Sequence, residues 1–214
     1  TLDGTGGRRP AFNLIARPDR MAVKTVIIST PRSGWFTCAA ERGSGLAVWL
    51  DLARKLPRDT RGVNLEFVVT SGHEYEYLGG EEYLEHHAPK PAVTRLWLHI
   101  GASAAARDWH DGPILRPLPS ADSQRILTAT PNVIEGVRKA FKGVSGLEAA
   151  YVADATTAGG ELVNVLKAGY PEMIGEYGGH RWFHTRGDDL RCVSGDLVSP
   201  VAKAFHAAVL SALA

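Results

Sequence analysis

The chain has 214 residues, which is enough for one domain with a substantial hydrophobic core. Its hydrophobic share of 44% and charged share of 22% are typical of globular proteins, and they exclude disordered, collagen-like and coiled-coil classes. With 24 Lys and Arg against 23 Asp and Glu, the net charge of +1 provides no basic field for nucleic acid or an anionic membrane. We therefore expect a small-molecule or peptide substrate as the partner.

Apolar runs and cysteines give a weak indication of compartment. Runs such as Val63–Val69 and Leu96–Ile100 are too short to span a bilayer, and no signal-peptide pattern opens the chain. Cys38 and Cys192 are the two cysteines, and no C-x-x-C spacing occurs, so we expect a reducing, cytoplasmic setting. The first residue is not Met, and residues 1–10 are expected to be flexible or to be the end of an upstream segment.

The first hundred residues alternate between strand and helix patterns. A β-branched run, a helical period that we expect Pro57 to end, an apolar run before Ser71-Gly72, a second helix and a third apolar run follow in order. The expected elements are strands at 23–29, 63–70 and 94–100, helices at 45–56 and 74–87, and a loop or short helix start at 101–106. This alternation predicts a mostly parallel sheet.

The rest of the chain has weaker patterns. Helices are expected at 123–130, 133–141 and 161–167, strands at 147–152 and 171–175, and a closing amphipathic helix at 199–213. No repeat or long linker divides the sequence. We predict a single domain over residues 1–214, of the α/β class, with a three-layer, mixed but mainly parallel β-sheet and helices on both faces.

Several familiar motifs are absent or incomplete. The sequence lacks G-x-S-x-G, the Walker A pattern and G-x-G-x-x-G, which argues against an α/β-hydrolase, a P-loop and a dinucleotide site. His73-Glu74 could open an H-E-x-x-H zinc helix, but Tyr77 stands where the second His is required. Glu82 and His86 are spaced for one helix face and are interpreted as a surface pair.

Polar side chains follow the expected strands at the places where ligands gather in open α/β sheets. Arg32 and Glu41 follow the first strand, His73 and Glu74 the second, His99 ends the third, and His184 lies in the last loop. Two carboxylates and an imidazole from separate strand ends can hold one Zn²⁺ and leave a position open.

The order of these elements resembles the zinc aminopeptidases, a family with a phosphorylase/hydrolase-like fold that includes the glutaminyl cyclases. Glu41-Arg42-Gly43-Ser44-Gly45 resembles the family's D-N-x-S-G segment, and His73-Glu74 with Leu78-Gly79 resembles its G-E-E and L-G segments. Leu98-His99-Ile100 is similar to the L-D-M strand, and Phe183-His184-Thr185 with Asp188 to F-H-T-x-x-D. The resemblance covers residues 11–214.

The resemblance implies one zinc ion rather than two. It places Glu41, Glu74 and His184 on the second-metal set, which glutaminyl cyclases use for a single zinc. The first-metal motif H-x-D falls on Thr30-Pro31-Arg32, where neither ligand is present. The catalytic Glu corresponds to His73, and an Asp that binds the first metal corresponds to His99.

Roles for the remaining candidates follow from their chemistry. An imidazole titrates near neutral pH, so His73 can move a proton, and Arg32 or His99 can stabilise an oxyanion or a substrate carboxylate. We expect Arg32 to replace the missing cation and to pair with Glu41 or with a substrate carboxylate. Trp35 and Phe36 are expected to wall the substrate pocket.

Structural alternatives remain open beside these roles. Glu41 could instead cap a helix, Arg32 could be an ordinary solvated loop arginine, His99 could be a hydrogen-bonded core residue, and Cys38 could pair with His73.

The sequence thus supports two functions of different classes. The first is a metal-dependent hydrolase or acyl-transfer enzyme that acts on an amide or peptide-like small substrate through a single zinc. The alternative is a catalytically inactive, aminopeptidase-like binding or assembly module, which is motivated by the loss of H-x-D and of the catalytic Glu. A spatial cluster of Glu41, Glu74 and His184 would favour the enzyme, whereas carboxylates paired with Arg32 or Arg42 would favour the binding module.

Overall fold

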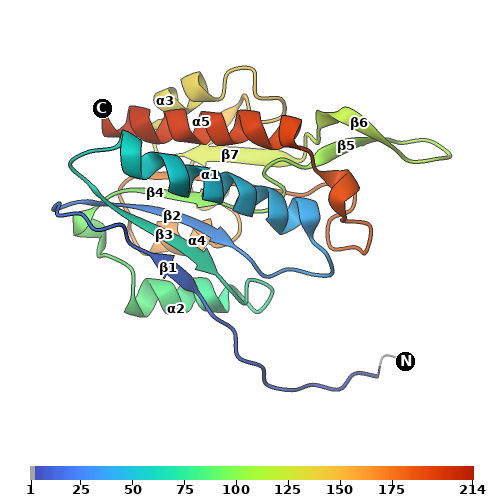
Figure 1. The fold of residues 1–214 in the computed structure, drawn as a ribbon, viewed down its shortest axis with the longest axis horizontal. Helices are drawn as coiled ribbons and strands as arrows, with labels where there is room; N and C mark the ends of the chain where they lie inside the picture. The colour runs from blue at the N-terminus through green and yellow to red at the C-terminus, as the bar shows by residue number, and fades with distance from the viewer. Residues whose placement is uncertain (1–2) are drawn as a thin grey trace.

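One seven-stranded sheet organises the computed structural model, which describes residues 3–214 (Figure 1). The strand order is β1-β3-β2-β4-β9-β7-β8, and β5 and β6 form a separate two-stranded hairpin. The strands are β1 Leu14–Ala16, β2 Thr25–Pro31, β3 Asn64–Thr70, β4 Thr94–Ile100, β5 Arg107–His110, β6 Arg116–Ala121, β7 Arg125–Ala129, β8 Ala150–Val152 and β9 Met173–Gly178. This sheet confirms the predicted α/β class with a mixed, mainly parallel sheet.

The four central strands β3, β2, β4 and β9 run parallel to one another. β2 pairs with β3 from Thr25 opposite Asn64 to Pro31 opposite Thr70, so the two strands end together. Because β4 and β9 run the same way, all four carboxyl ends meet at one edge, and the segments that follow them are neighbours in space. β1 and β7 are antiparallel to their neighbours.

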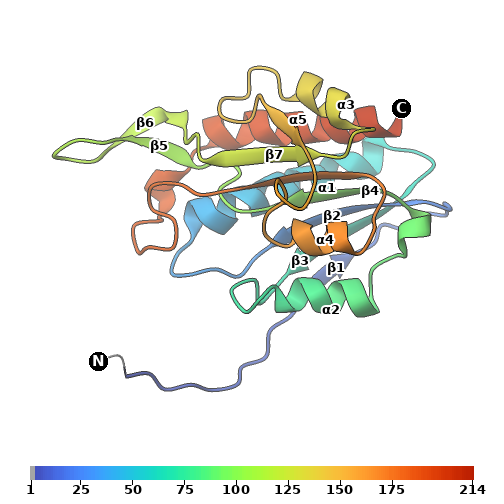
Figure 2. The same ribbon diagram turned by 180° about the vertical axis from the view of Figure 1, so that it is seen from behind.

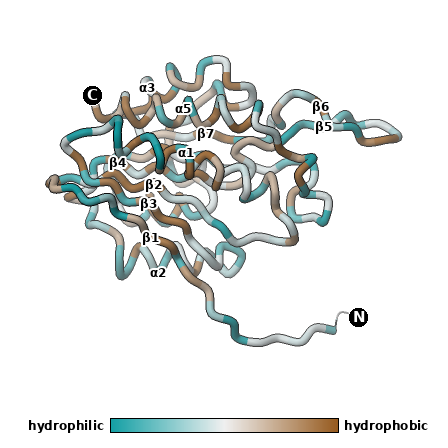
Figure 3. Tube along the Cα trace, viewed as in Figure 1, coloured by the Kyte–Doolittle hydropathy of each residue, from teal (hydrophilic) through white to brown (hydrophobic). Residues whose placement is uncertain are grey.

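Helices cover both faces of the sheet, as predicted. α1 (Ser44–Asp59), α3 (Ile134–Ala140) and α5 (Gly195–Leu213) lie on one face, and α2 (Leu78–His86) and α4 (Leu162–Lys167) lie on the other (Figures 1 and 2). The larger core lies under α1, α3 and α5 and includes Leu52, Leu98 and Phe205. Apolar segments accordingly follow the central strands, and polar segments gather on the outer loops (Figure 3).

α5 is long and apolar enough, by length and composition alone, to cross a membrane. In this fold it is a core helix, because Val201, Phe205, Ala208 and Val209 are buried against α1 and α3.

The segment before the central sheet is held along its edge. Residues 3–13 form no helix or strand, whereas β1 pairs with β3. Arg17 makes a two-pronged ion pair with buried Glu66, and the Arg32 side chain donates to the Phe12 carbonyl at 2.9 and 3.1 Å. The prediction that residues 1–10 are flexible or belong to an upstream segment stays a prediction. Residues 1 and 2 of this range lie outside the described residues.

Some element predictions were wrong. The helix expected at 123–130 is strand β7, which pairs with β9 and β8, and its Arg-Ile-Leu-Thr-Ala sequence is compatible with a buried strand. The helix expected from Glu74 begins at Leu78, because Glu76 and Tyr77 have left-handed backbone conformations. Pro57 does not end α1, which continues to Asp59. The expectations also missed β1 and the β5–β6 hairpin.

Candidate functional site

A cleft of about 350 Å³ opens at the carboxyl ends of the parallel strands. His73 and Glu74 enter it after β3, Gly101 and Ala102 after β4, and the loop after β9 contributes Phe183 and His184. These are the segments that the sequence predicted to meet.

An unusual turn places Glu41 next to the cleft residues Arg42, Glu74 and His184. It lies in a short π-helical turn, Ala39–Gly43, which begins after Cys38 in a left-handed conformation and continues into α1. The backbone N–H groups of Ala40 and Glu41 donate to the two carboxylate oxygens of Asp188 at 2.7 and 3.0 Å. The Glu41 side chain is completely buried, yet neither of its carboxylate oxygens has a hydrogen-bond partner within residues 3–214.

Glu74 and His184 converge on Glu41. His184 Nε2 lies 3.2 Å from Glu41 Oε1 and 3.7 Å from Glu74 Oε2. One potential ligand atom from each of the three residues lies within 4.8 Å of the others. The structure therefore brings together the three residues that the sequence identified as metal ligands, although their ligand role stays a prediction.

Arg42 occupies the position that was expected for Arg32. Its Nη2 lies 2.7 Å from Glu74 Oε1 and 3.1 Å from Glu41 Oε1, while its Nε donates to the Ser33 carbonyl at 2.7 Å. The Arg42 side chain is only 2% exposed. By contrast, Arg32 is exposed and is held by Phe12, so the expected ion pair between Arg32 and Glu41 is not formed. The role proposed for Arg32 in the cleft has no support from this geometry.

Burial and charge act in opposite directions on Glu41. Burial raises the pKa of the Glu41 carboxyl above its ordinary value, and the positive charge of Arg42 partly offsets this shift. The positive charge of Arg42 therefore stabilises the ionised form of Glu41, which burial disfavours.

His73 belongs to a second polar group, which includes a residue that the sequence analysis missed. Its Nδ1 lies 3.0 Å from Oε1 of Glu161, a buried carboxylate that also accepts a hydrogen bond from Thr70 Oγ1 at 2.9 Å. Burial raises the pKa of Glu161, but the hydrogen bond from His73 and the nearby His99 outweigh burial and bring it below the ordinary value. Glu161 lies 88 residues from His73 in the sequence, and no local pattern connects the two.

His99 is both a core residue and a cleft residue. Its Nδ1 lies 2.9 Å from Ser29 Oγ, which also accepts a hydrogen bond from Trp97 Nε1 at 2.8 Å. Its Nε2 is buried without a partner in the described chain, and the ring lines the cleft. Burial lowers the pKa of His99 to about 4, so the imidazole is neutral at neutral pH.

Aromatic side chains surround the three converging residues. Trp35 Nε1 donates to Glu74 Oε2 at 3.1 Å, and Phe183 stacks on His184 with ring centroids 4.0 Å apart. Phe36 is about half exposed and lies beneath the Arg186 guanidinium. Trp35 contacts the cleft residue Glu74, but neither Trp35 nor Phe36 is among the residues that line the cleft, so their pocket role stays a prediction; Phe183, which lines the cleft, was missed.

Backbone strain is concentrated at this end of the sheet. Six residues other than glycine have positive φ angles: Phe36, Cys38, Glu76, Tyr77, Ser103 and His184. Each such conformation costs of the order of 1 kcal/mol or more and persists only where the surroundings enforce it. All six lie in the segments that form or support the cleft.

Cys38 has no ion pair or hydrogen bond to His73, so the alternative of a Cys38–His73 pair has no support.

Gly79 explains one part of the sequence resemblance. A Cβ at this position would lie 2.1 Å from the Ser71 carbonyl oxygen, so only glycine fits at the start of α2. The Leu78-Gly79 pair therefore reflects how closely α2 packs behind the turn that carries Glu74.

Comparisons with known proteins locate this fold. No protein-family model matches the sequence, and no curated protein matches it. Among solved structures, a zinc aminopeptidase from Bacillus subtilis aligns with a TM-score of 0.68 and 18% identity, over 92% of this chain and 48% of its own. An aminopeptidase from Aneurinibacillus sp. strain AM-1 aligns with a TM-score of 0.71 and 18% identity, over 94% and 47%.

A glutaminyl cyclase from Porphyromonas gingivalis aligns over 92% of this chain and 76% of its own, with a TM-score of 0.68 and 14% identity. The present chain spans about half the length of the two aminopeptidases. At these identities the comparisons concern architecture. The chain shares the fold of zinc aminopeptidases and glutaminyl cyclases.

Proposed function

We propose that the cleft is the active site of a metal-dependent hydrolase or acyl-transfer enzyme that acts on an amide or peptide-like small molecule, with one Zn²⁺ held by Glu41, Glu74 and His184. The observation that carries this proposal is the convergence of these residues around the completely buried Glu41 carboxylate, whose oxygens accept no hydrogen bond of good geometry within residues 3–214, although Arg42 Nη2 and His184 Nε2 lie 3.1 and 3.2 Å from Oε1. An undonated buried carboxylate is costly unless a cation compensates it.

The donor set fits a zinc ion in type and spacing. Carboxylate oxygens and imidazole nitrogens both bind zinc, and a set of three protein ligands leaves one position open, as catalytic zinc sites require. Ligand atoms bound to zinc in a tetrahedral arrangement lie about 3.3 Å apart, and the distances of 3.2 and 3.7 Å from His184 Nε2 to Glu41 and Glu74 are close to this value. Glu41 Oε2 accepts no hydrogen bond within the described residues.

Zinc bound there would supply Lewis-acid chemistry, because it polarises a substrate carbonyl and makes water more acidic. The other steps fall to the chain's own residues. His73 can accept and return a proton through the ring nitrogen that Glu161 does not hold, and Glu161 fixes the orientation of the ring. His99 Nε2 offers the cleft a neutral imidazole nitrogen for hydrogen bonding. Trp35 and Phe183 provide apolar walls for a substrate side chain.

One observation favours the second candidate function, a binding module without catalysis. Arg42 already bridges Glu41 and Glu74, and a guanidinium keeps its charge at any physiological pH. It therefore opposes a metal ion and could hold the site shut as a permanent ion pair. In that case the cleft would recognise a ligand without transforming it.

Metal analysis of protein purified without chelator separates the two functions. The enzyme predicts zinc bound in the cleft, so Glu74→Gln should lower the bound zinc by about one equivalent, whereas Glu76→Gln, a matched change at an exposed carboxylate that also lines the cleft, should leave it unchanged. Turnover of a panel of aminoacyl and peptide amides should follow the metal. Wild-type protein that binds no metal and gains no activity with added Zn²⁺ would contradict the enzyme and leave the binding module.

A further inference from the structure

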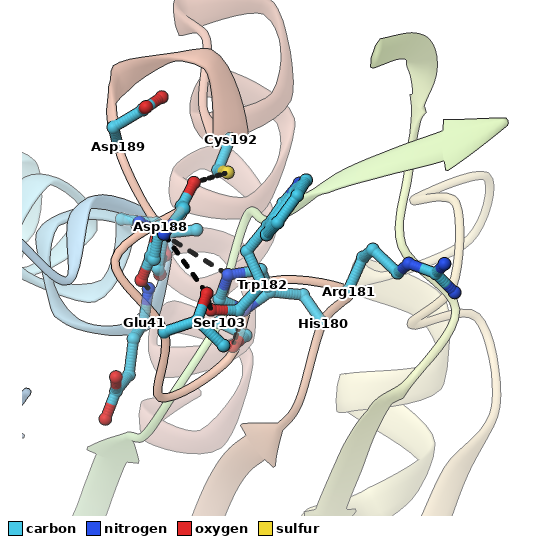
Figure 4. A network of polar contacts seen from close by, with 12 residues as sticks. Glu41, Ser103, His180, Arg181, Trp182, Asp188, Asp189 and Cys192 are labelled. Atoms are coloured by element: carbon cyan, nitrogen blue, oxygen red, sulfur yellow. Dashed lines mark hydrogen bonds and ion pairs between the residues drawn. The ribbon is translucent and has the colours of Figure 1, made fainter. Parts of the chain in front are cut away.

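A second group of potential ligands lies behind the cleft, in the loop that carries His184. His180, Asp188 and Cys192 each place one nitrogen, oxygen or sulfur atom within 4.8 Å of the other two. All three side chains are buried. Figure 4 shows them facing a common point, while Arg181 and Asp189 turn away. We propose that these three residues form a structural Zn²⁺ site that is separate from the cleft.

The strongest observation is the state of His180. Its Nδ1 lies 2.9 Å from Ser103 Oγ, which fixes the ring, and its Nε2 is buried without a hydrogen-bond partner among the described residues. That nitrogen lies 3.5 Å from Asp188 Oδ1, which is longer than a hydrogen bond of good geometry. A ring held through one nitrogen, with the other nitrogen directed at a carboxylate and a thiol, is the usual arrangement of a metal-bound histidine.

Asp188 is oriented in the same manner. Each of its two oxygens accepts one backbone N–H, from Ala40 and from Glu41, and each retains capacity for a further partner. No Lys or Arg side chain in the described chain makes an ion pair with it, since Arg181 pairs with Asp111 and Arg191 pairs with Asp189. The buried charge of Asp188 thus lacks the kind of partner that Arg42 gives to Glu41.

The ligand types select the metal. A thiolate, an imidazole and a carboxylate together suit Zn²⁺, whereas Ca²⁺ and Mg²⁺ require oxygen ligands. Cys192 donates its thiol proton to the Gly187 carbonyl at 3.3 Å, and this proton would leave to solvent as the sulfur binds the ion. All three ligands are buried and none of them lines the cleft, so a substrate in the cleft would not reach the ion, and we assign the ion a structural role.

The proposed ion would connect the parts of the cleft. His180, Asp188 and Cys192 flank His184 in one loop, and Asp188 holds the turn that carries Glu41. The ion would therefore fix two of the cleft's proposed ligands relative to each other without touching either of them.

Cobalt is the appropriate test metal, because a cysteine thiolate bound to Co²⁺ gives a near-ultraviolet charge-transfer band that carboxylate and imidazole ligands do not. The chain is produced in zinc-free medium with Co²⁺, so that the buried site is loaded as the protein folds. We expect this band in the wild type, in Glu74→Gln, which removes a cleft ligand, and in Cys38→Ser. We expect its loss in Cys192→Ser.

Each result bears on this site independently of the cleft. The chain has two cysteines, so a band that persists in Cys38→Ser assigns the sulfur to Cys192 even if Cys192→Ser does not fold. A folded wild-type protein without the band, or a band lost in Cys38→Ser, would overturn the proposal. Cobalt bound without the band would place the ion in the cleft alone.

Discussion

Two clusters of potential metal ligands lie at this end of the sheet: Glu41, Glu74 and His184 in the cleft, and His180, Asp188 and Cys192 behind it. The two clusters differ in the groups that stabilise their buried charges. In the cleft, Arg42 stands between Glu41 and Glu74, and His184 is 43% exposed. Behind it, Asp188 is held by backbone N–H groups, and its neighbours His180 and Cys192 are both buried. The open cluster thus includes an arginine beside its carboxylates, whereas the closed cluster is organised by backbone N–H groups and has no Lys or Arg partner within residues 3–214.

The largest effect is expected at the closed cluster. Asp188→Ala removes the acceptor of two backbone hydrogen bonds at the turn that carries Glu41 and leaves His180 buried without its neighbour. Breaking such a buried polar group should lower the free energy of unfolding by about 3 to 5 kcal/mol, measured by urea denaturation. Glu74→Ala, at the more open cluster, should cost less, about 1 to 2 kcal/mol, because Arg42 keeps Glu41 as a partner. Equal losses would break the comparison.

The pH dependence of stability tests whether burial lowers the pKa of His99. Its pKa is about 4 in the folded chain against 6.5 for an ordinary histidine, so the unfolded chain binds the extra proton first as the pH falls. The contribution of neutral His99 to the free energy of unfolding, about 3 kcal/mol, is therefore fully present above about pH 6.5. It is lost as the pH falls from 6.5 to 4. His99→Gln should remove this part of the pH dependence. Parallel stability profiles for the wild type and the variant would contradict the burial argument.

Replacing Arg42 should change the zinc affinity of the cleft. Arg42→Met keeps the apolar stem and removes one positive charge beside Glu41 and Glu74, so Zn²⁺ should bind the cleft roughly 100-fold more tightly, about 3 kcal/mol, as expected for one unit charge a few ångströms away. Isothermal titration calorimetry measures the affinity. The matched control is Arg32→Met, which removes an exposed arginine outside the cleft. Unchanged zinc affinity in Arg42→Met would show that the guanidinium does not compete with a metal.

The smallest effect is expected for Arg32 itself. Arg32→Ala removes two hydrogen bonds to the Phe12 carbonyl at an exposed site, which should cost about 0.5 to 1 kcal/mol of stability and leave ligand binding in the cleft unchanged. Thermal unfolding and binding of a small carboxylate measure the two quantities. Weaker carboxylate binding in this variant would show that Arg32 takes part in ligand binding in the cleft.

Much of the fold was accessible from sequence because its signals are local. The continuous apolar runs of β2, β3 and β4 and the helical period of α1 need no tertiary context to be recognised. β7 was mistaken for a helix because a short apolar segment fits both periods, and only its pairing with β9 decides between them.

The site was predicted less completely, for a physical reason. Glu41, Glu74 and His184 were found because each follows a strand or lies in a motif with a recognisable order. The position of Arg42 depends on a π-helical turn that directs two consecutive side chains into one cleft, and Glu161 reaches His73 across 88 residues. Neither relation leaves a period or a spacing in the sequence.

The short strand β1 has a consequence for how this chain remains separate from its copies. It pairs antiparallel with β3, whose Asn-Leu-Glu-Phe-Val-Val-Thr sequence would otherwise form the bare edge of the sheet. An unpaired apolar edge of this kind recruits strands from other molecules and starts aggregation. The ion pair of Arg17 with Glu66 and the contact of Arg32 with Phe12 hold this cover in place. An exposed arginine far from the chemistry therefore helps to keep the molecule free of fibrous assembly.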